Sequence, residues 1–565
     1  MTLWSVLLIS LMFQGAPQRA TPGSISGTLV EEGTGKAVSE ARLQVMDTAG
    51  SVYSAISDPD GKFLFPALTP DVYTRLSVQA QGYAKFDYDA HPELPALNLS
   101  LRPKLDGIRI ELIRTGSISG RVLDADGNPA VDFTVQALQP AYENGNRTWK
   151  LAQSRPTNDL GEFRFFWLTP GRYYIRCLQT DSIETFIHSA LRTVEINDFR
   201  TEMVPAAIRI VADDGSVRDE GLFPVYYPGT PESAMAIPIE VRPGSQVSGI
   251  EFQSLRVPVH RVAGKISGLP GRPDLDRFVR LIPIGTGLAE SLSEWPDLST
   301  SIADDLSFEI AGVPPGSYML LADVSINGYR LSGRARVEVQ NSDVSNVVVN
   351  PVPNVELSGH FHLEGESAGD PTLIVFTEIR LRSELRRTDY ITGTIDGAVL
   401  KFPNVPPGDY QLETDTLAVR VSGRNEALPV YIDSISMGNQ NVLQDGLHVT
   451  SSDQILEIGL RSNFARLSGR VNPAAPGAFG STVVLIPENR KDRIRFKSAA
   501  PGRDGSFQFA DVSLGNYHIF AWEHVGDGAW FNAQFLAEFE GRGRPVTIVP
   551  GDNVAGEIPL ISRER

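Results

Sequence analysis

Cysteine is almost absent from this sequence, since its 565 residues include only Cys177. A single thiol excludes any disulfide bond within the chain. Cys177 lies in the apolar run 173–178, which is typical of a strand, and this favours a small buried hydrophobic side chain. An intermolecular disulfide bond, in an exported protein, is the alternative.

Basic residues are in deficit. The chain has 51 Lys and Arg against 68 Asp and Glu, which gives a net charge of −17. Nucleic-acid binding needs clustered Lys and Arg to neutralise phosphates, so this composition argues against a nucleic-acid partner. The acidic excess is spread along the chain without long acidic runs, and it favours solubility.

Long hydrophobic runs are also missing, apart from residues 3–13. That run is shorter than the roughly 20 residues that span a bilayer, and it has the size of the hydrophobic part of a signal peptide. Met1 and Thr2 carry no basic charge, which departs from the usual pattern. We expect a signal peptide at 1–20, with cleavage near Ala16 or Ala20. The mature chain would then have no transmembrane span and would be periplasmic, secreted or on the cell surface.

What the sequence has in abundance is short alternating runs separated by turns. Residues 116–174 begin with Ser-Ile-Ser-Gly-Arg-Val after Gly116, pass through an Asp-Gly-Asn-Pro turn at 126–129, and end with two further apolar runs. Alternation of apolar and polar residues between Gly, Asp, Asn and Pro clusters indicates strands joined by tight turns.

The same pattern recurs five times. A tyrosine follows the second residue of a late apolar pair at a gap of eight residues each time: 65→73, 165→173, 310→318, 402→410 and 509→517. Five identical gaps among divergent segments predict five tandem copies of one module. The expected modules span 22–105, 106–256 (with an insertion), 257–352, 353–462 and 463–563. In the first, the alternating residues 96–101 are expected to form the last strand. The sequence therefore predicts an all-β chain, a tandem array of about five Greek-key β-sandwich modules.

Three motifs carry a family resemblance. The opening Ser119-Gly120-Arg121-Val122, the Asp-x-Gly-x-Phe-x-Phe turn at 159–165 and Pro170-Gly171-Arg172-Tyr173 resemble the carboxypeptidase regulatory-like domain. The resemblance implies a transthyretin-like, seven-stranded Greek-key β-sandwich, related to the Cna protein B-type and starch-binding-like folds. Some copies depart from the motifs, with Asp304-Asp305 in the third module and Leu514-Gly515 in the fifth.

No catalytic or metal-binding signature is complete. The His-x-x-Glu pair of zinc carboxypeptidases is missing, because none of the eight histidines has Glu three residues later. His360 and His362 would share one strand face, but no third zinc ligand can be assigned. We expect no catalytic residues, no metal site and no cofactor.

The five repeated tyrosines, Tyr73, Tyr173, Tyr318, Tyr410 and Tyr517, are expected to be structural. A tyrosine at a fixed distance next to a corner resembles the tyrosine corner of β-sandwiches, in which the hydroxyl group bonds nearby backbone. Loop aromatic residues are a different matter. Tyr226, Tyr227 and Trp530 are the candidate ligand-binding residues, expected to be exposed, and the alternative is that they fold over module edges.

These observations favour a non-enzymatic exported scaffold or binding protein, with another exported protein as its partner. The alternative is a polysaccharide-binding protein that uses the loop aromatic residues. Resemblance of fold alone does not decide between the two.

Overall fold

The structure is a computed structural model of the chain. It describes residues 22–88, 97–143, 145–178, 207–211, 217–269, 277–284, 298–363, 374–385, 390–414, 417–420, 428–450, 454–462, 465–472, 481–502, 504–523 and 525–562. The expected signal peptide at 1–20 lies outside these residues.

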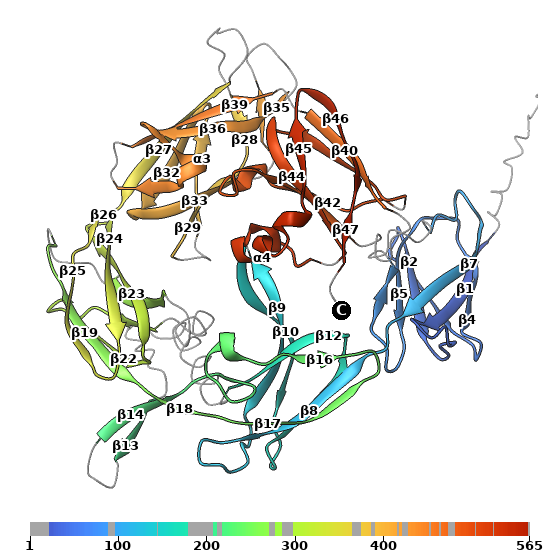
Figure 1. Ribbon diagram of the computed structural model, residues 1–565, viewed down its shortest axis with the longest axis horizontal. Coiled ribbons are helices and arrows are strands. Elements are labelled where there is room, and N and C mark those ends of the chain that lie inside the picture. Colours follow the sequence, from blue (N-terminus) through green and yellow to red (C-terminus); the bar gives the residue numbers. More distant parts are fainter. Residues whose placement is uncertain are drawn as a thin grey trace, which may run out of the picture. The chain divides into compact units, whose positions relative to one another are not determined.

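The predicted all-β class is confirmed, since almost every element of the described chain is a strand of a small sheet (Figure 1). The contacts divide the chain into two compact units. The first holds residues 1–116 and 242–244, and the second holds 117–241 and 245–565.

The first unit contains one sandwich of seven strands. The strands are β1 (Gly23–Glu31), β2 (Arg42–Asp47), β3 (Val52–Ile56), β4 (Lys62–Leu68), β5 (Tyr73–Gln79), β6 (Phe86–Asp87) and β7 (Lys104–Leu112). They form two sheets in the orders β4-β1-β7 and β3-β2-β5-β6. The core between the sheets runs from Ile25 to Leu112.

The second unit begins with a sandwich built from the sheets β11-β8-β17 and β10-β9-β12-β15, with β16 paired to β12. Its strands are β8 (Gly116–Leu123), β9 (Thr134–Glu143), β10 (Asn146–Pro156), β11 (Glu162–Leu168), β12 (Gly171–Leu178), β15 (Val225–Tyr226), β16 (Ile239–Val241) and β17 (Gln246–Gln253). A small separate sheet follows the order β13 (Ala207–Val211), β14 (Val217–Leu222) and β18 (Arg256–Pro258).

The third sandwich joins the sheets β22-β19-β25 and β21-β20-β23-β24-β26. Its strands are β19 (His260–Ile266), β20 (Arg277–Pro283), β21 (Leu298–Ser301), β22 (Ser307–Val313), β23 (Gly316–Ile326), β24 (Tyr329–Val339), β25 (Val344–Val349) and β26 (Val352–Pro353).

The fourth sandwich joins β31-β32-β27-β39-β36-β37 to β30-β29-β33-β38, beside a small sheet β28-β34-β35. Its elements are β27 (Val355–Leu363), β28 (Ile374–Phe376), β29 (Ile379–Ser383), β30 (Tyr390–Thr392), β31 (Thr394–Asp396), β32 (Val399–Val405), β33 (Gly408–Thr414), β34 (Ala418–Arg420), β35 (Leu428–Pro429), β36 (Tyr431–Met437), β37 (Gln440–Asn441), α3 (Val442–Asp445), β38 (Leu447–Val449) and β39 (Ile455–Arg461).

The fifth sandwich joins β43-β40-β46 to β42-β41-β44-β45, with β47 paired to β44. Its elements are β40 (Ala465–Val471), β41 (Thr482–Pro487), the 3-10 helix η4 (Arg493–Arg495), β42 (Lys497–Ala499), β43 (Ser506–Val512), β44 (Gly515–Trp522), η5 (Ala529–Phe531), α4 (Ala533–Ala537), η6 (Glu540–Arg542), β45 (Arg544–Ile548), β46 (Gly551–Ile558) and β47 (Leu560–Ile561).

The opening strand is central in every sandwich. It pairs in antiparallel fashion with the strand of the late apolar pair and in parallel fashion with the closing strand. The alternation read from the sequence explains the burial on the antiparallel partner. In β4, Phe63, Phe65 and Leu68 are buried between exposed residues, and in β11 the corresponding residues are Phe163, Phe165 and Leu168.

The expectation of a strand at residues 96–101 is wrong. Residues 96–101 alternate in polarity and were expected to close the first module at 105, but the described part of this segment is a turn, in which the side chain of Asn98 accepts from the amide of Leu101 at 3.1 Å. The closing strand is β7, and the first core therefore extends past 105 to Leu112. The division of the whole chain into these five modules stays a prediction.

The glycine of the repeated Ser-Gly pair is required by a close approach of the backbone. A Cβ atom on Gly27, Gly120 or Gly264 would lie 1.9 to 2.0 Å from a carbonyl oxygen of the closing strand. The register of the parallel pair also shifts at these positions in β1, β8 and β19. A carbonyl oxygen occupies this space because the pair is bulged, which is the usual role of an isolated strand glycine.

The five repeated tyrosines are all buried, with exposed fractions of 4 % or less. Each hydroxyl group donates to the carbonyl oxygen of the residue four positions earlier. The acceptors are those of Thr69 (3.0 Å), Thr169 (2.7 Å), Pro314 (2.8 Å), Pro406 (2.6 Å) and Ser513 (2.9 Å) for Tyr73, Tyr173, Tyr318, Tyr410 and Tyr517. This is the geometry of a tyrosine corner, because the ring fills the core while the hydroxyl group fixes the turn before the strand.

We predict that Gly120→Ala destabilises the second sandwich by about 3 kcal/mol, at the upper end of the cost of overpacking, because the backbone must move away from the carbonyl oxygen of Ile250. Gly359→Ala is the matched control from the fourth sandwich, since its Cβ would meet side-chain atoms only and would come no closer than 3.2 Å, to the Cβ of Leu456. The control is expected to remain within about 1 kcal/mol of the unmodified protein. Hydrogen exchange of the amides of β8 and β27 measures the stability change in each variant. Equal losses of stability in the two variants would contradict the close approach of the backbone at Gly120.

We predict that Tyr173→Phe destabilises the second sandwich by about 1 kcal/mol, the usual net value of one hydrogen bond. The ring stays in the core, so only the bond to the carbonyl oxygen of Thr169 is lost. Tyr174→Phe, on the opposite face of the same strand, is the control. Hydrogen exchange of the amides of β12 reports the change, and an unchanged exchange rate in Tyr173→Phe would reject the structural role.

Candidate functional site

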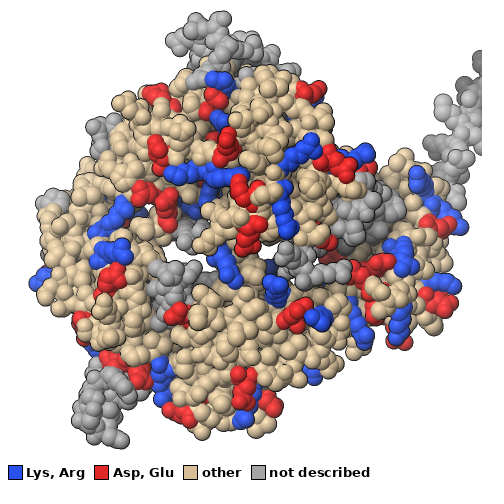
Figure 2. All heavy atoms as spheres, viewed as in Figure 1, with Lys and Arg blue, Asp and Glu red and all other residues tan. Residues whose placement is uncertain are grey.

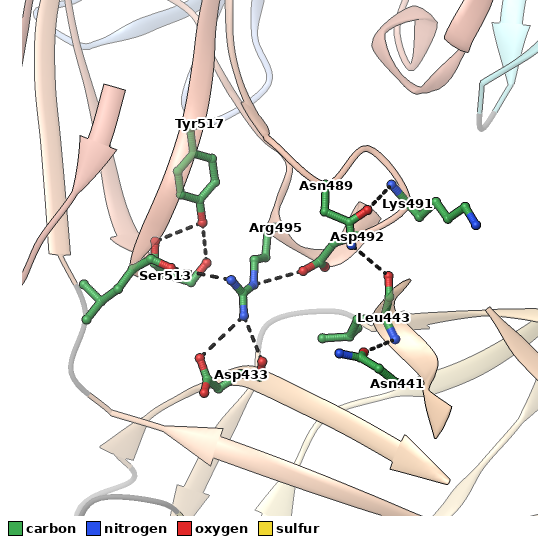
Figure 3. Close-up of polar contacts among 10 residues, drawn as sticks. Asp433, Asn441, Leu443, Asn489, Lys491, Asp492, Arg495, Ser513 and Tyr517 are labelled. Carbon is green, nitrogen blue, oxygen red and sulfur yellow. Dashed lines mark hydrogen bonds and ion pairs between the residues drawn. The ribbon is translucent and has the colours of Figure 1, made fainter. Parts of the chain in front are cut away.

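An arginine between the fourth and fifth sandwiches is the centre of a polar network (Figure 3). Arg495 is the last residue of η4 in the fifth sandwich. Its Nη2 donates to the carbonyl oxygen of Asp433 at 2.8 Å and lies 3.5 Å from the Oδ1 of that residue. Asp433 belongs to β36 of the fourth sandwich, so one guanidinium group joins the two modules.

Further contacts reinforce this junction. Arg461 of the fourth sandwich places its Nε 2.8 Å from Asp433 Oδ2, so the carboxylate lies between two guanidinium groups. A second hydrogen bond crosses from Asn489 Nδ2 to the carbonyl oxygen of Leu443 at 3.3 Å. The acceptor is held in place because the side chain of Asn441 caps α3, accepting from the amide of Leu443 at 3.1 Å.

Asp492 is the buried acid of the junction. Its Oδ2 lies 3.0 Å from Arg495 Nε, an ion pair without the alignment of a hydrogen bond, and the residue is 5 % exposed. Burial raises the pKa of the Asp492 carboxyl group to about 6, because the loss of hydration outweighs the attraction of Arg495. The junction therefore contains a carboxylate whose ionised form is disfavoured in the folded state.

The junction was not identified from the sequence. Its signal is a charged run at 489–495, which directly follows the buried strand β41 and precedes β42. A run of this kind usually indicates a solvated loop. Here it is held against the tyrosine corner, since Arg495 Nη1 lies 3.5 Å from the carbonyl oxygen of Leu514, three residues before Tyr517.

A second cluster lies on the outer face of the fifth sandwich. Val484, Ile486, Phe520 and Trp522 point away from the main core and are covered by the segment that contains η5, α4 and η6. The rings of Phe520 and Trp522 are stacked with centroids 5.0 Å apart. Trp530 belongs to this cover and is 6 % exposed, so the expectation that its side chain is exposed is wrong. The apolar outer face explains the burial, because such a face must be covered.

The cover segment also contacts the tip of the β9–β10 hairpin of the second sandwich. Asn532 Nδ2 donates to the carbonyl oxygen of Gly145 at 2.8 Å, and Asn532 Oδ1 caps α4. Tyr142 and Phe535 form an edge-to-face pair with centroids 5.6 Å apart. Gly145 has φ +81°, and a Cβ there would lie 2.6 Å from the Cβ of Phe531. The hairpin tip thus fits the cover segment only with glycine at 145.

The two loop tyrosines of the second sandwich do not form an exposed patch. Tyr226 is 0 % exposed in β15, and its hydroxyl group accepts from Arg176 Nη1 at 3.3 Å, so the expectation of exposure is wrong. Tyr227 is half-buried and packs on Phe252 at 6.1 Å between ring centroids. Both pack against the sandwich because β15 adds to the edge of the sheet next to β12. Trp530 belongs to a different apolar cluster, that of the fifth sandwich.

The structure also gives the surroundings of the two histidines and the cysteine that the sequence analysis singled out. His360 and His362 flank Glu457, with Nδ1 atoms 3.6 and 3.7 Å from its carboxylate oxygens. Within the described ranges, no group of three His, Cys, Asp or Glu residues could hold a metal ion. Cys177 is 1 % exposed in the second core, and burial raises the pKa of its thiol to about 12. A thiol of this kind is unreactive.

Charge on the visible face is mixed in sign. Figure 2 shows acidic and basic side chains interspersed, without a large patch of one sign. Among the residues that the structure describes, no helix is long and apolar enough to cross a membrane.

Fold and site together define a multi-domain β-sandwich protein whose best-formed polar site joins two modules. Residues 24–96 match the model of the carboxypeptidase regulatory-like domain, so the resemblance is confirmed for the first module. No curated protein sequence matches the chain at a significant level.

Among solved structures, the chain is similar to three bacterial proteins at low identity. The TIE protein of Bacillus anthracis is 11 % identical, with 80 % of this chain and 76 % of that chain covered and a TM-score of 0.14. GBS52, the minor pilin of Streptococcus agalactiae, is 11 % identical, covers 44 % of this chain and 100 % of its own, and has a TM-score of 0.20. BcpA, the major pilin subunit of Bacillus cereus, is 10 % identical, with 62 % and 99 % covered and a TM-score of 0.14. At these TM-scores we draw nothing further from them.

We predict that Asp492→Asn changes the free energy of unfolding more favourably at pH 8 than at pH 4.5, in each case relative to the unmodified protein. The folded-state pKa is raised to about 6 from a usual value of 3.8, so the folded protein binds more protons than the unfolded chain between these values. Ionisation of Asp492 therefore lowers the free energy of unfolding as pH rises through this window, by up to the order of 2 kcal/mol. Asp492→Asn has no carboxyl group at this position, so its free energy of unfolding does not fall for this reason.

Denaturant unfolding at both pH values, followed by hydrogen exchange of peptides from β36 and η4, measures the difference. Asp504→Asn is the control, because Asp504 is an exposed turn residue of the same module with a lowered pKa. A variant that loses the same free energy at both pH values would show that the carboxylate of Asp492 is not disfavoured by burial.

Proposed function

We propose that this chain is an exported, non-enzymatic scaffold whose second to fifth β-sandwich modules are held in fixed mutual positions by specific side-chain contacts. The observation that carries the proposal is the junction at Arg495, where buried or half-buried charged groups from two modules are paired. Charged groups are buried only where geometry is well defined, since the loss of hydration must be compensated. A flexible string of modules would leave such groups in water.

Two other observations support the proposal. Asn532 of the fifth sandwich uses its amide both to cap α4 and to bind the second sandwich. Residues 3–13 have the length and polarity of the hydrophobic part of a signal peptide, which supports export. The partner of such a scaffold is another exported protein or a polysaccharide.

The scaffold role predicts one narrow distance distribution between the fourth and fifth modules. Spin labels at Asn439→Cys and Val554→Cys, both exposed, report this distance by pulsed electron resonance. Cys177 does not interfere, because its thiol is buried. Asp433→Ala should broaden the distribution because it removes the carboxylate between Arg461 and Arg495. Glu111→Ala, which breaks an exposed ion pair with Arg109 in the first unit, is the control and should leave it narrow.

A broad distribution in the unmodified protein would refute the fixed junction. The non-enzymatic part is tested separately, by a screen of the purified protein against peptidase, esterase and glycosidase substrates. Turnover that a single substitution abolishes would overturn it.

A further inference from the structure

A cleft of about 700 Å³ lies between the third and fourth sandwiches. One wall is the outer face of the sheet that contains β20, β23 and β24. The alternation of strands places Asp323 and Ser325 on this face of β23, and Arg330, Ser332 and Arg334 on the same face of β24. The facing wall is formed by residues 406–410 and by Tyr390 and Ile391 of the fourth sandwich.

The two walls are tied together. Arg334 Nη2 donates to the carbonyl oxygen of Pro407, and a Cβ on Gly408 would lie 2.8 Å from this nitrogen. Asn354, where the chain passes from one sandwich to the next, donates from Nδ2 to the carbonyl oxygen of Asn404 at 3.2 Å. The cleft is therefore a shaped site and not an open gap, of a volume typical of ligand sites.

The charged side chains that line the cleft are three arginines and two aspartates. Both carboxylates have partners, since Asp323 accepts from Ser332 Oγ at 3.1 Å and Asp409 lies 2.5 Å from His448 Nδ1. The guanidinium carbon of Arg280 lies over the ring of Phe278, 4.9 Å from its centroid. An excess of guanidinium groups in a chain of net charge −17 makes the cleft a local site for carboxylates, which arginine binds with two parallel hydrogen bonds.

The cleft also offers surfaces and acceptors that suit a sugar. Tyr390, which is 40 % exposed, lines the cleft together with Pro406 and Pro407. These residues have apolar rings, against which the C–H groups of a pyranose can pack. Asn354 Oδ1 is shielded from solvent and has no hydrogen-bond partner among the described residues. A buried acceptor without a partner is costly, and a hydroxyl group of a ligand would satisfy it.

A peptide suits the cleft less well. Peptides commonly bind by adding a strand to an exposed sheet edge. Here β24 is paired along its whole length with β23, and Leu331 and Ser332 are also paired with β26 on the other side. The cleft wall is thus a sheet face, which offers side chains and not backbone groups.

We propose that the cleft binds an oligosaccharide that carries carboxylate groups, such as a segment of a uronic-acid polysaccharide, with Arg280 and Arg330 contacting the carboxylates. The proposal rests on the scaffold role in one respect, because the third and fourth sandwiches must keep their mutual position. It replaces the exposed aromatic patch expected from the sequence with a different site.

Isothermal titration of the full chain with an oligogalacturonate hexasaccharide tests the proposal. We expect saturable binding that weakens with salt and is reduced about tenfold or more by Arg280→Gln and by Arg330→Gln. Arg336→Gln is the matched control, because Arg336 lies on the same face of β24, is exposed, pairs with Glu338 at 2.9 Å and does not line the cleft. This variant should bind as the unmodified protein does.

Two further ligands separate the alternatives. A neutral cellohexaose should bind much more weakly, and equal binding would overturn the role of the carboxylates. Polyglutamate should also bind weakly, and equal binding would show that the cleft accepts any acidic chain. No binding of the uronate, or binding unchanged in both arginine variants, would overturn the proposal. The spin-label distance between the fourth and fifth modules is independent of these results, so a failure here is distinguishable from a failure of the scaffold role.

Discussion

A carbonyl oxygen of the closing strand occupies the place of a missing side chain in the opening strand of each of the first three sandwiches. Backbone also approaches the opening strand from its other side. A Cβ on Gly61 or Gly161, in the turn before the antiparallel partner, would lie 2.4 Å from a carbonyl oxygen of the opening strand, that of Leu29 or Val122. The opening strand is therefore enclosed by backbone, and two sheets can close around its apolar face. The tyrosine corner and the late apolar pair both depend on the strand that this contact positions.

The modules have similar cores, but they differ in the side chains on the outer faces of their sheets and in what covers those faces. In the fifth sandwich that face is apolar, and η5, α4 and η6 cover it. In the third it carries arginine, aspartate and serine and remains a wall of the cleft. Around Arg495, charged residues on the surface of one module contact the next module. Function in such a chain therefore depends on surfaces that the repeat does not prescribe.

This difference explains which features could be predicted. The gap of eight residues before each tyrosine spans one turn between consecutive strands that lie in opposite sheets, such as β4 and β5. It therefore recurs in the sequence and predicts the buried tyrosines and the fold. Tyr226 and Trp530 looked like exposed loop residues because the surfaces that bury them are not local. Gly145 and Asn532 are separated by 387 positions, and no pattern in a single sequence links them. The closing strand β7 was missed since residues 96–101 alternate equally well.

The parallel pairing of opening and closing strands has a mechanical consequence. Because β8 and β17 run in the same direction, the entrance and the exit of that sandwich lie at opposite ends of one strand pair. Tension along the chain would then load the hydrogen bonds of the pair together, in shear, and would not open them one after another as in a zipper. The other sandwiches share the arrangement. In single-molecule stretching, each sandwich would then unfold in a separate event at high force.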